Sequence, residues 1–250
     1  MLKKYFFMTL LVFSTTIYAF DKEISITIDD LPFVGRSSSP GEMKHKHDRF
    51  NRILQALIDA RIPATGFVIA GAIANGQWQL LENFQKNGFI IGNHTYSHDN
   101  LNQIGAEKYI NDIAKADQRL TPLMTTKKYF RYPYLEEGNG KSKHQVQQFL
   151  TKNQYRIAPV TIDSKDFIFN VKLISSHLRN RSERLEQVKE RYLSYLSKET
   201  EKAEKRANGQ PVKQILLIHA NLLNSYLIGD VIQYYKDHGY RFISLDDALS

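Results

Sequence analysis

Two histidines, His94 and His98, lie four residues apart in the segment Gly92-Asn93-His94-Thr95-Tyr96-Ser97-His98. The side chains around them carry hydroxyl and amide groups rather than the aliphatic groups of a core. In one helical turn, or in a tight loop after a strand, both imidazole rings can point at one place. Neutral imidazole binds zinc, copper, nickel and iron, so this pair could begin a metal site. Two ligands do not make a tight site, and such pairs also occur by chance on surface helices.

A third ligand is available from Asp29 or Asp30, which end the apolar, β-branched segment of residues 24–30. Two adjacent Asp residues at the end of a strand point in different directions, so one can bind a cation while the other stays free as a general base. Cysteine cannot contribute, because the chain has none. Any metal site must therefore use histidine and carboxylate ligands.

The elements that would position these groups alternate along the chain. Apolar and β-branched runs predict strands at 24–30, 65–69, 89–91, 128–131, 156–162, 214–218 and 240–244. Apolar residues at helical spacing predict helices near 47–60, 77–86, 106–120, 144–152 and 222–237. Strands that alternate with helices favour a mainly parallel α/β sheet, and seven such strands could close into a barrel.

Polar groups capable of chemistry follow the carboxyl ends of these predicted strands. In barrels and in open α/β sheets, active sites are built on that face. We therefore expect one site there, formed by Asp29, Asp30, His94, Arg131, Asp163 and His219.

One stretch departs from this pattern of short connections. Residues 171–207 are rich in charge, and their apolar residues predict one long helix or a helical hairpin inserted before the sixth strand. We expect its apolar face to lie on the barrel wall, with a partner-binding role as the alternative. Residues 208–211 end the insertion, which therefore spans 171–211. The apolar residues at helical spacing are Leu178, Leu185, Val188, Tyr192 and Leu196.

The first residues have the pattern of a secretory signal. Lys3 and Lys4 form a basic start, residues 5–13 are a nearly unbroken apolar run, and Ala19 offers a small residue for cleavage. We interpret residues 1–19 as a signal peptide and 20–250 as the mature domain of a periplasmic or secreted protein. Retention of the signal as an uncleaved anchor is the alternative. The apolar run is too short to span a bilayer comfortably, and no later segment is long and apolar enough.

Length, composition and net charge limit the classes of protein to which the chain can belong. A length of 250 residues with 42% hydrophobic content fits one large α/β domain or two small ones. The net charge of +8 can serve solubility alone, or it can attract an anionic polymer such as a cell-wall glycan or the outer face of a membrane. Nucleic acid is disfavoured as a partner, because the Lys and Arg residues are spread out and the signal points away from the cytoplasm.

The chain resembles the polysaccharide deacetylases of the NodB-homology type, carbohydrate esterase family 4, over nearly all of its mature length. Five motifs of that family occur in order, at the ends of the predicted strands. They are Thr27-Ile28-Asp29-Asp30 for T-F-D-D, His94-Thr95-Tyr96-Ser97-His98 for H-(S/T)-x-x-H, Arg131-Tyr132-Pro133-Tyr134 for R-x-P-Y, Asp163-Ser164-Lys165-Asp166-Phe167 for D-x-x-D-W, and Leu217-Ile218-His219 for L-x-H.

This resemblance implies a distorted (β/α)7 barrel and a divalent cation, usually zinc, held by Asp30, His94 and His98. Asp29 would be the general base that activates the attacking water, and Arg131 would hold that base. Elementary chemistry agrees, since a cation lowers the pKa of a bound water and polarises an amide carbonyl. A carboxylate on a cation cannot also be a free base, so the adjacent Asp residues would divide the two roles.

The other implied roles concern the leaving group and the acyl pocket. The backbone N–H of Tyr134 would help bind the oxyanion. His219 would be the general acid that protonates the leaving amine, oriented by Asp166, and histidine suits that task near neutral pH. Leu217 and Phe167 would border the pocket for the acetyl methyl group.

Three departures from the family pattern bear on substrate preference. Leu31 stands where the family usually has Gly after the two Asp residues, and Pro32 restricts it to extended geometry. Phe167 replaces the usual Trp, which leaves a smaller aromatic wall without an indole N–H. Leu135, followed by two glutamates, stands where Gly is common, which places acids near the mouth.

The expected function is removal of N-acetyl groups from amino sugars of an envelope or extracellular glycan, such as peptidoglycan or a chitin-like oligosaccharide. The same fold could instead act on O-acetyl esters, formyl amides or cyclic amides, or serve as a non-catalytic glycan-binding protein. A non-haem iron oxygenase would also use two His and one carboxylate, but its usual double-stranded β-helix does not match the alternating helices and strands.

Structural alternatives to these roles also stay open. The metal ligands could form a hydrogen-bonded polar cluster without a metal. Arg131 could be part of a structural ion pair, and Asp163 could be a strand-end cap or a loop residue. The oligomeric state is not predicted.

Overall fold

The computed structural model describes residues 22–33, 39–175, 181–208 and 212–250. The predicted signal peptide at 1–19 and Leu178 of the predicted insertion lie outside these ranges. Within the described ranges, no helix combines the length and the apolar composition needed to cross a membrane.

The central strand, β1 (Lys22–Leu31), is covered on both faces. Its isoleucines pack against the helices in the main hydrophobic cluster, and its alternate residues face the inside of the barrel. A strand buried on both sides is typical of parallel sheets, and in β1 both the isoleucines and the polar residues between them are buried. The buried residues are Ile24, Ile26 and Ile28 on the first face, and Ser25, Thr27 and Asp29 on the second.

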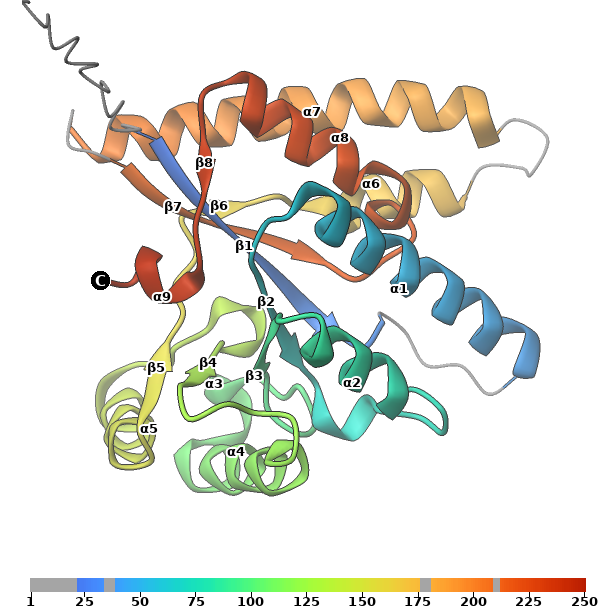
Figure 1. The fold of residues 1–250 in the computed structure, drawn as a ribbon. Coiled ribbons are helices and arrows are strands. Elements are labelled where there is room, and N and C mark those ends of the chain that lie inside the picture. Colours follow the sequence, from blue (N-terminus) through green and yellow to red (C-terminus); the bar gives the residue numbers. More distant parts are fainter. Residues whose placement is uncertain (1–21, 34–38, 176–180, 209–211) are drawn as a thin grey trace, which may run out of the picture.

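All the strand pairs are parallel, and their order follows a distorted barrel (Figure 1). β1 pairs with β7 (Val212–His219) along one edge, and with β2 (Ala64–Val68) and β8 (Arg241–Phe242) along the other. The hydrogen-bonded order is β5-β4-β3-β2-β1-β7-β6, which confirms the expected distorted (β/α)7 barrel. The remaining strands are β3 (Ile90–Asn93), β4 (Lys128–Phe130), β5 (Tyr155–Ile157) and β6 (Ile162–Asp163).

The prediction of one continuous strand at 156–162 is wrong, because the chain changes partners in the middle of it. β5 pairs with β4, whereas β6 pairs with β7 at the other end of the strand order. Between them, the N–H of Ala158 donates to the carbonyl of Phe130, and the N–H of Thr161 donates to that of Ile215. Pro159 has no N–H to continue either ladder. The barrel is therefore closed at this seam by the chain itself rather than by a strand pair.

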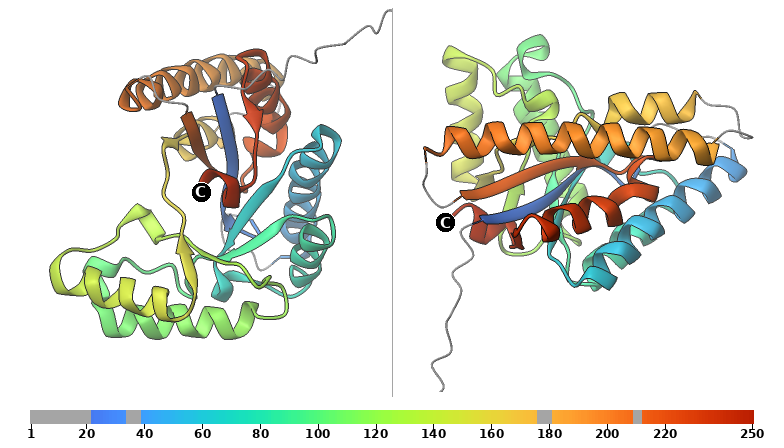
Figure 2. Two further views of the ribbon diagram at one scale, coloured as in Figure 1. Left: turned by 60° about the vertical axis from the view of Figure 1, so that its left-hand side comes forward. Right: turned by 90° about the horizontal axis from the view of Figure 1, so that it is seen from above.

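Helices surround the sheet on its outside (Figures 1 and 2). α6 and α7 lie beside β6 and β7, with α8 next to α1, whereas α4 and α5 lie at the β4–β5 end of the sheet. The α-helices are α1 (Pro40–Ala60), α2 (Trp78–Lys86), α3 (Leu101–Ile104), α4 (Ala106–Leu120), α5 (Gly140–Lys152), α6 (Asp166–Ile174), α7 (Arg181–Arg206), α8 (Asn224–Asp237) and α9 (Leu245–Ala248), and the short 3-10 helices are η1 (Ala70–Ala72) and η2 (Pro133–Leu135).

The first helix begins earlier than the predicted residue 47. The hydroxyl of Ser39 accepts a hydrogen bond from the N–H of Glu42 and donates one to the Glu42 carboxylate. Serine followed three residues later by glutamate is a capping-box pattern, so Pro40 becomes the first helical residue of α1. In contrast, α4 spans the predicted residues 106–120.

The predicted insertion contains two helices in the described ranges. α6 begins at Asp166, inside the fourth motif, and α7 covers most of the charged stretch. Along α7, Val188, Tyr192 and Leu196 are buried, and Leu185 is partly buried. The apolar stripe therefore packs on the domain, with the Tyr192 ring 5.3 Å from that of Phe169 in α6.

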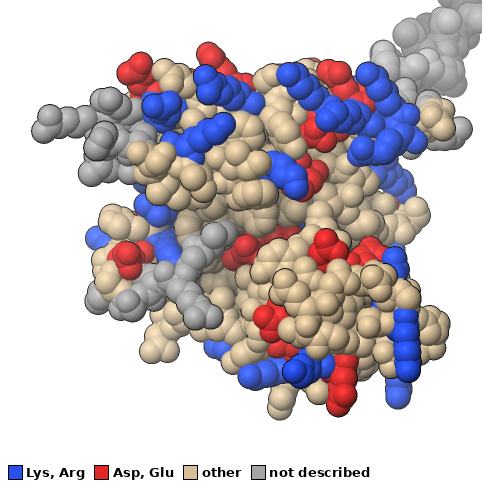
Figure 3. Space-filling model, turned by 180° about the vertical axis from the view of Figure 1, so that it is seen from behind, with Lys and Arg blue, Asp and Glu red and all other residues tan. Residues whose placement is uncertain are grey.

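Charge is mixed on the surface. Figure 3 shows acidic side chains interspersed among the lysine and arginine side chains of that face, with wide uncharged areas between them. The net positive charge does not form a continuous basic surface on that face.

Gly92→Ala in β3 is expected to destabilise the fold by about 1–3 kcal/mol, because overpacking a close-packed interior forces side chains to shift. The added methyl group would lie 2.6 Å from the ring of Phe67 and 3.1 Å from the carbonyl oxygen of Tyr129. Urea unfolding followed by circular dichroism measures the change.

Gly229→Ala in α8 is the matched control, since its added methyl group meets no atom within 4 Å. Replacing a glycine inside a helix by alanine should raise stability by up to about 1 kcal/mol. Equal stability of the two variants would contradict the close packing of β3 against β2.

Candidate active site

A cavity of about 400 Å³ opens at the carboxyl ends of the strands. It gathers most of the residues predicted for the site, whereas Arg131 and Asp166 lie behind its walls. The lining residues are Asp29, Asp30, His94, His98, Tyr134, Leu135, Asp163, Lys165, Phe167, Asn170, Leu217, His219 and Asn221.

Asp30, His94 and His98 form a compact cluster of possible metal ligands, with one ligand atom from each within 4.8 Å of the others. The Oδ1 atom of Asp30 lies 3.6 Å from Nε2 of His94 and 3.4 Å from Nε2 of His98. That oxygen is buried and finds no hydrogen-bond partner among the described residues. A buried carboxylate oxygen without a partner costs free energy unless a cation or a donor reaches it. The cluster therefore fits a divalent cation, and its donor set suits zinc.

Both imidazoles of the cluster favour the neutral form that binds metals. Burial lowers the pKa of His94 well below its ordinary value, and burial also lowers the pKa of His98. Nδ1 of His94 lies 2.8 Å from the carbonyl oxygen of Arg131. A carbonyl only accepts, so Nδ1 carries the proton and Nε2 presents its lone pair towards Asp30.

A tight loop, and not a helical turn, brings the two histidines together. Thr95 and His98 both adopt left-handed backbone conformations, with φ of 64° and 62°. The carboxylate of Asp112, from α4, accepts hydrogen bonds from the N–H groups of Tyr96 and Ser97 and from the Ser97 hydroxyl, all at 2.9 Å. Asp112 thus holds the loop that supplies both imidazoles. Sequence analysis missed it, because it lies in a separate helix with no motif of its own.

Asp29 is held by Arg131 inside the barrel. Nη1 of Arg131 lies 3.3 Å from both carboxylate oxygens of Asp29, and both side chains are almost fully buried. Burial raises the pKa of Asp29 to about 6, although Arg131 and His219 act to lower it. A carboxylate with a raised pKa is a better proton acceptor near neutral pH than an ordinary one.

The remaining donors of Arg131 reach the backbone and a hydroxyl. Nε donates to the carbonyl of Ala158 at 2.6 Å, and Nη2 donates to Oγ1 of Thr27 at 3.1 Å and to the carbonyl of Pro159 at 3.4 Å. The guanidinium also lies over the ring of Phe67, 4.7 Å from its centroid. Arg131 therefore orients Asp29 and at the same time ties the seam of the barrel to β1.

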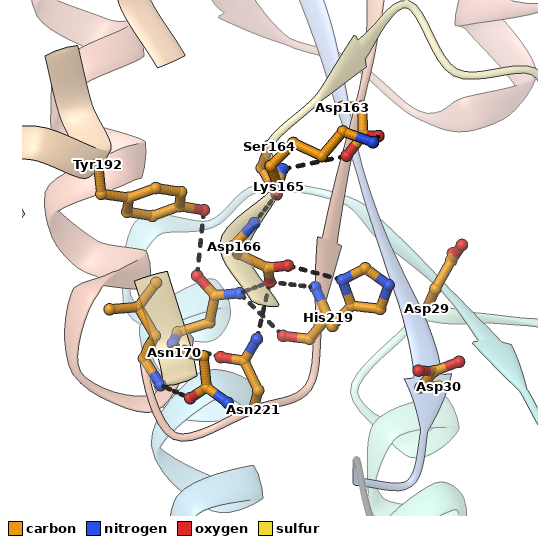
Figure 4. A network of polar contacts seen from close by, with 12 residues as sticks. Asp29, Asp30, Asp163, Ser164, Lys165, Asp166, Asn170, Tyr192, His219 and Asn221 are labelled. Atoms are coloured by element: carbon orange, nitrogen blue, oxygen red, sulfur yellow. Dashed lines mark hydrogen bonds and ion pairs between the residues drawn. The ribbon is translucent and has the colours of Figure 1, made fainter. Parts of the chain in front are cut away.

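His219 is paired with Asp166 on the other side of the cavity (Figure 4). Asp166 accepts hydrogen bonds from Nδ1 and from the backbone N–H of His219, both at 2.7 Å. Burial alone would lower the pKa of His219, but the Asp166 carboxylate outweighs it and raises that pKa to about 10. The ring of His219 extends from Asp166 towards Asp29 and Asp30 (Figure 4).

Two asparagines that sequence analysis missed complete this pair. The side-chain amides of Asn221 and Asn224 donate to the same oxygen of Asp166 that accepts the backbone N–H of His219. Asp166 is fully buried, and these donors keep its negative charge satisfied. The two asparagines lie two and five residues after His219 of the L-x-H motif, so their proximity to it in sequence could have indicated them.

The rim of the cavity is aromatic and aliphatic. Tyr134 is 62% exposed, its backbone has φ of 58°, and its ring meets that of His98 at 4.6 Å. Phe167 meets the ring of His219 edge to face at 6.2 Å, while Leu217 is buried in the wall. These positions bring the three residues predicted to bind substrate to one cavity.

The other polar residues near the mouth have local partners. Asp163, the last residue of β6, accepts a hydrogen bond from the N–H of Lys165 and forms a 2.7 Å ion pair with its ammonium group, as a strand-end cap would. Glu136 accepts from Asn102, and Glu137 pairs with Lys143. Neither glutamate lines the cavity. Leu31 is also absent from the lining, because its side chain is fully buried near Gly66, so it does not alter the rim directly.

Comparison with known proteins matches the chain to one family. A family model described as polysaccharide deacetylase matches residues 19–158, which is more than half of the chain. The peptidoglycan-N-acetylglucosamine deacetylase of Bacillus cereus is 30% identical over 117 residues, covering 46% of this chain and 40% of that protein. The chain spans less than half the length of the curated relatives it matches.

Solved structures share the fold at lower sequence identity. A family 4 carbohydrate esterase from Streptomyces lividans, in complex with acetate, gives a TM-score of 0.61 at 18% identity and covers 92% of this chain and 97% of that chain. A pseudoenzyme of the same esterase family from Bacillus anthracis gives a TM-score of 0.66 at 15% identity, and the match covers 92% of this chain and 66% of that chain. Because a pseudoenzyme shares this fold, the fold alone does not show activity.

Asp112→Ala is expected to weaken binding of Zn²⁺ by about 10- to 100-fold, because residues that orient metal ligands contribute that much to affinity. The loop with His94 and His98 would lose three hydrogen bonds while both imidazoles remain. Isothermal titration of the metal-stripped protein with Zn²⁺ measures the affinity. Glu107→Gln, in the exposed first turn of α4, is the matched control and should leave it unchanged. Equal affinities in both variants would contradict the role of Asp112.

Proposed function

The chain belongs to the polysaccharide deacetylase family, the NodB-homology group known as carbohydrate esterase family 4, and on that premise we propose that it removes N-acetyl groups from amino sugars. In this proposal the enzyme is a metal-dependent hydrolase, and its substrate is an envelope or extracellular glycan such as peptidoglycan or a chitin-like oligosaccharide. The name of the Bacillus cereus relative supports that substrate class. Export by the signal at 1–19 is part of the same proposal.

The observation that carries the proposal is the position of Asp29 beside His219. The two residues are register partners at the ends of the parallel strands β1 and β7, so their backbones run about 5 Å apart. Asp29 is a carboxylate with its pKa raised to about 6, and His219 is an imidazole with its pKa raised to about 10. At neutral pH one can accept a proton and the other can donate one, next to a cluster that fits a cation.

A divalent cation bound by Asp30, His94 and His98, which we propose to be Zn²⁺, would supply Lewis acidity that polarises the amide carbonyl and lowers the pKa of a bound water. Asp29 accepts a proton from the attacking water as the new C–O bond forms. Arg131 keeps the carboxylate oriented through its contacts with both oxygens. The carbonyl oxygen gains negative charge, and the backbone N–H of Tyr134 at the rim donates to it.

The second half of the reaction breaks the C–N bond. His219 donates its Nε2 proton to the leaving nitrogen, so the products are acetate and a free amine on the sugar. Asp166 holds Nδ1 of His219 and keeps the imidazolium stable until that transfer. In the proposal, Leu217 and Phe167 form the walls against which the acetyl methyl group lies.

Metal-stripped protein is expected to release acetate from N-acetylglucosamine oligomers or from peptidoglycan only after Zn²⁺ is restored. His94→Ala removes a ligand and should abolish that acetate. Asp29→Asn leaves the three proposed ligands in place, so it should retain bound Zn²⁺ while activity falls by at least about 100-fold. Enzymatic acetate assay and metal analysis of the same samples measure both quantities.

Acetate release that survives complete chelation, or full activity in Asp29→Asn, would refute the mechanism. Zinc-loaded protein that releases no acetate from either glycan would refute the proposed substrate class. Acetylated xylan, a formylated amino sugar and a cyclic imide then test the ester, formyl amide and cyclic amide alternatives. Glycan binding without turnover of any of these substrates would identify a binding protein.

Asp166→Asn is expected to shift the alkaline limb of the kcat/KM profile to lower pH. The Asp166 carboxylate raises the pKa of His219 to about 10, and the acid must be protonated, so activity is present below that pKa and is lost above it. Removing the negative charge lowers the pKa, so activity is lost at lower pH. A profile that keeps its alkaline limb, with unchanged thermal stability, would exclude His219 as the acid.

A further inference from the structure

Exposed apolar side chains gather around one end of the active-site cavity. In the part of the chain that the structure describes, seven large apolar side chains are exposed, and all but Tyr226 belong to η2 or α6. Tyr134, Leu135 and Phe167, which stands at the start of α6, all line the cavity. The exposed apolar surface then continues along α6, away from the cavity.

The α6 helix is apolar on both of its faces. Phe169 and Leu173 are buried on the inner face, and the Phe169 ring contacts Tyr192 and Tyr195 of α7. On the outer side, Ile168, Val171 and Ile174 are 44%, 63% and 55% exposed. A helix that is apolar all round is normally buried in a core or in a membrane. Apart from Lys172, the exposed side of α6 therefore lacks the polar residues expected of a helix that meets only water.

Positive charge lies beside this apolar face. A pocket of about 140 Å³ between α6 and α7 is lined by Lys172, Arg184 and Arg191, and none of the described residues that line it carries a carboxylate. None of these three cations forms an ion pair with another residue of the described ranges. Arg184 donates to the side-chain oxygen of Gln187 in the pocket wall, and the ammonium group of Lys172 lies over the ring of Phe169. The pocket therefore presents a basic surface.

An anionic lipid bilayer can contact both the aliphatic outer face of α6 and the basic pocket beside it. We propose that Ile168, Val171 and Ile174 dock on an anionic lipid bilayer, and that Lys172, Arg184 and Arg191 contact its phosphate headgroups. Aliphatic side chains flanked by Lys and Arg are typical of helices that lie in a membrane interface, where apolar burial and attraction to anionic lipid act together. A soluble glycan would use the cations but would leave the aliphatic groups in water.

Docking of α6 has a consequence for the active site. Phe167 and Asn170 line the cavity and belong to this same helix of nine residues, which is about 13 Å long. The cavity mouth would therefore lie at the bilayer surface, where acetylated sugars carried by lipids or attached close to the membrane are within reach. The docking itself does not depend on the proposed chemistry, and its test needs no substrate.

The absence of cysteine allows a local test in the full chain. Ile174→Cys, labelled with an environment-sensitive fluorophore, is expected to shift to shorter wavelength with vesicles of phosphatidylglycerol and phosphatidylcholine, but not with phosphatidylcholine alone. Lys108→Cys, on the exposed side of α4 at the other end of the sheet, is the control and should not shift. Reading the signal at residue 174 separates docking by α6 from any contact made by residues 1–19.

Charge reversal tests the basic half of the surface. Lys172→Glu with Arg184→Glu should weaken the vesicle affinity, measured from the Ile174→Cys signal, by about tenfold or more. Lys141→Glu with Lys152→Glu, on the exposed side of α5, makes the same change of net charge and should have a much smaller effect.

The proposal fails if the label at residue 174 does not respond to anionic vesicles, or if the two charge reversals weaken binding equally. A shift that grows with protein concentration in the absence of lipid, together with a dimer in analytical ultracentrifugation, would also overturn it, because a second copy of the chain would then cover α6.

Discussion

The buried guanidinium of Arg131 connects the fold of this protein to its proposed chemistry. A buried charge costs several kcal/mol unless hydrogen bonds and an opposite charge compensate it. Arg131 finds these partners in Asp29, in Thr27 and in the carbonyls of Ala158 and Pro159. Those carbonyls belong to the seam between β5 and β6, where the chain changes its pairing partner from β4 to β7. Because the barrel is closed there without a strand pair, the same side chain stabilises the seam and holds the proposed base.

The backbone of Arg131 also supports the metal-type cluster. Its carbonyl oxygen lies 2.8 Å from Nδ1 of His94, and its N–H donates to the carbonyl of Asn93. The backbone conformation directs the side chains of Asp29 and Asp30 to different partners. Asp29 continues the pairing of β1 with β7, whereas Asp30 adopts a φ of 61° and turns its side chain to the histidines. Left-handed residues that are not glycine often mark functional sites, and Asp30 and His98 follow that pattern.

The family includes a protein described as a pseudoenzyme with the same fold, so the proposed activity depends on particular side chains. In this chain, both the carboxylate pair and the buried Asp166–His219 pair are present, and the buried charges of Asp29 and Asp166 have hydrogen-bond partners. The outer face of α6 also bears on function within the described ranges. Its aliphatic residues are exposed next to the cavity, as the proposed contact with a lipid bilayer requires.

The sequence by itself determined the local elements and the chemical groups at their ends. The apolar, β-branched run at 24–30 predicted a strand, and parallel strands must bring their carboxyl ends to one edge, so Asp29, His94 and His219 could be assigned to one site before any coordinates. Hydrophobic periodicity reports only which residues are buried. It does not report which distant group each one meets.

Tertiary structure decided the features that depend on such distant partners. The segment at 156–162 has the composition of one strand, but Phe130 and Ile215 accept hydrogen bonds from different parts of it and divide it in two. Asp112 has no local motif, and its role arises only because α4 packs beside the loop of His94. The sequence also could not show that the outer face of α6 is exposed. Aliphatic residues occur on both faces of this helix, and only the packing of α7 against one face shows which of them are buried.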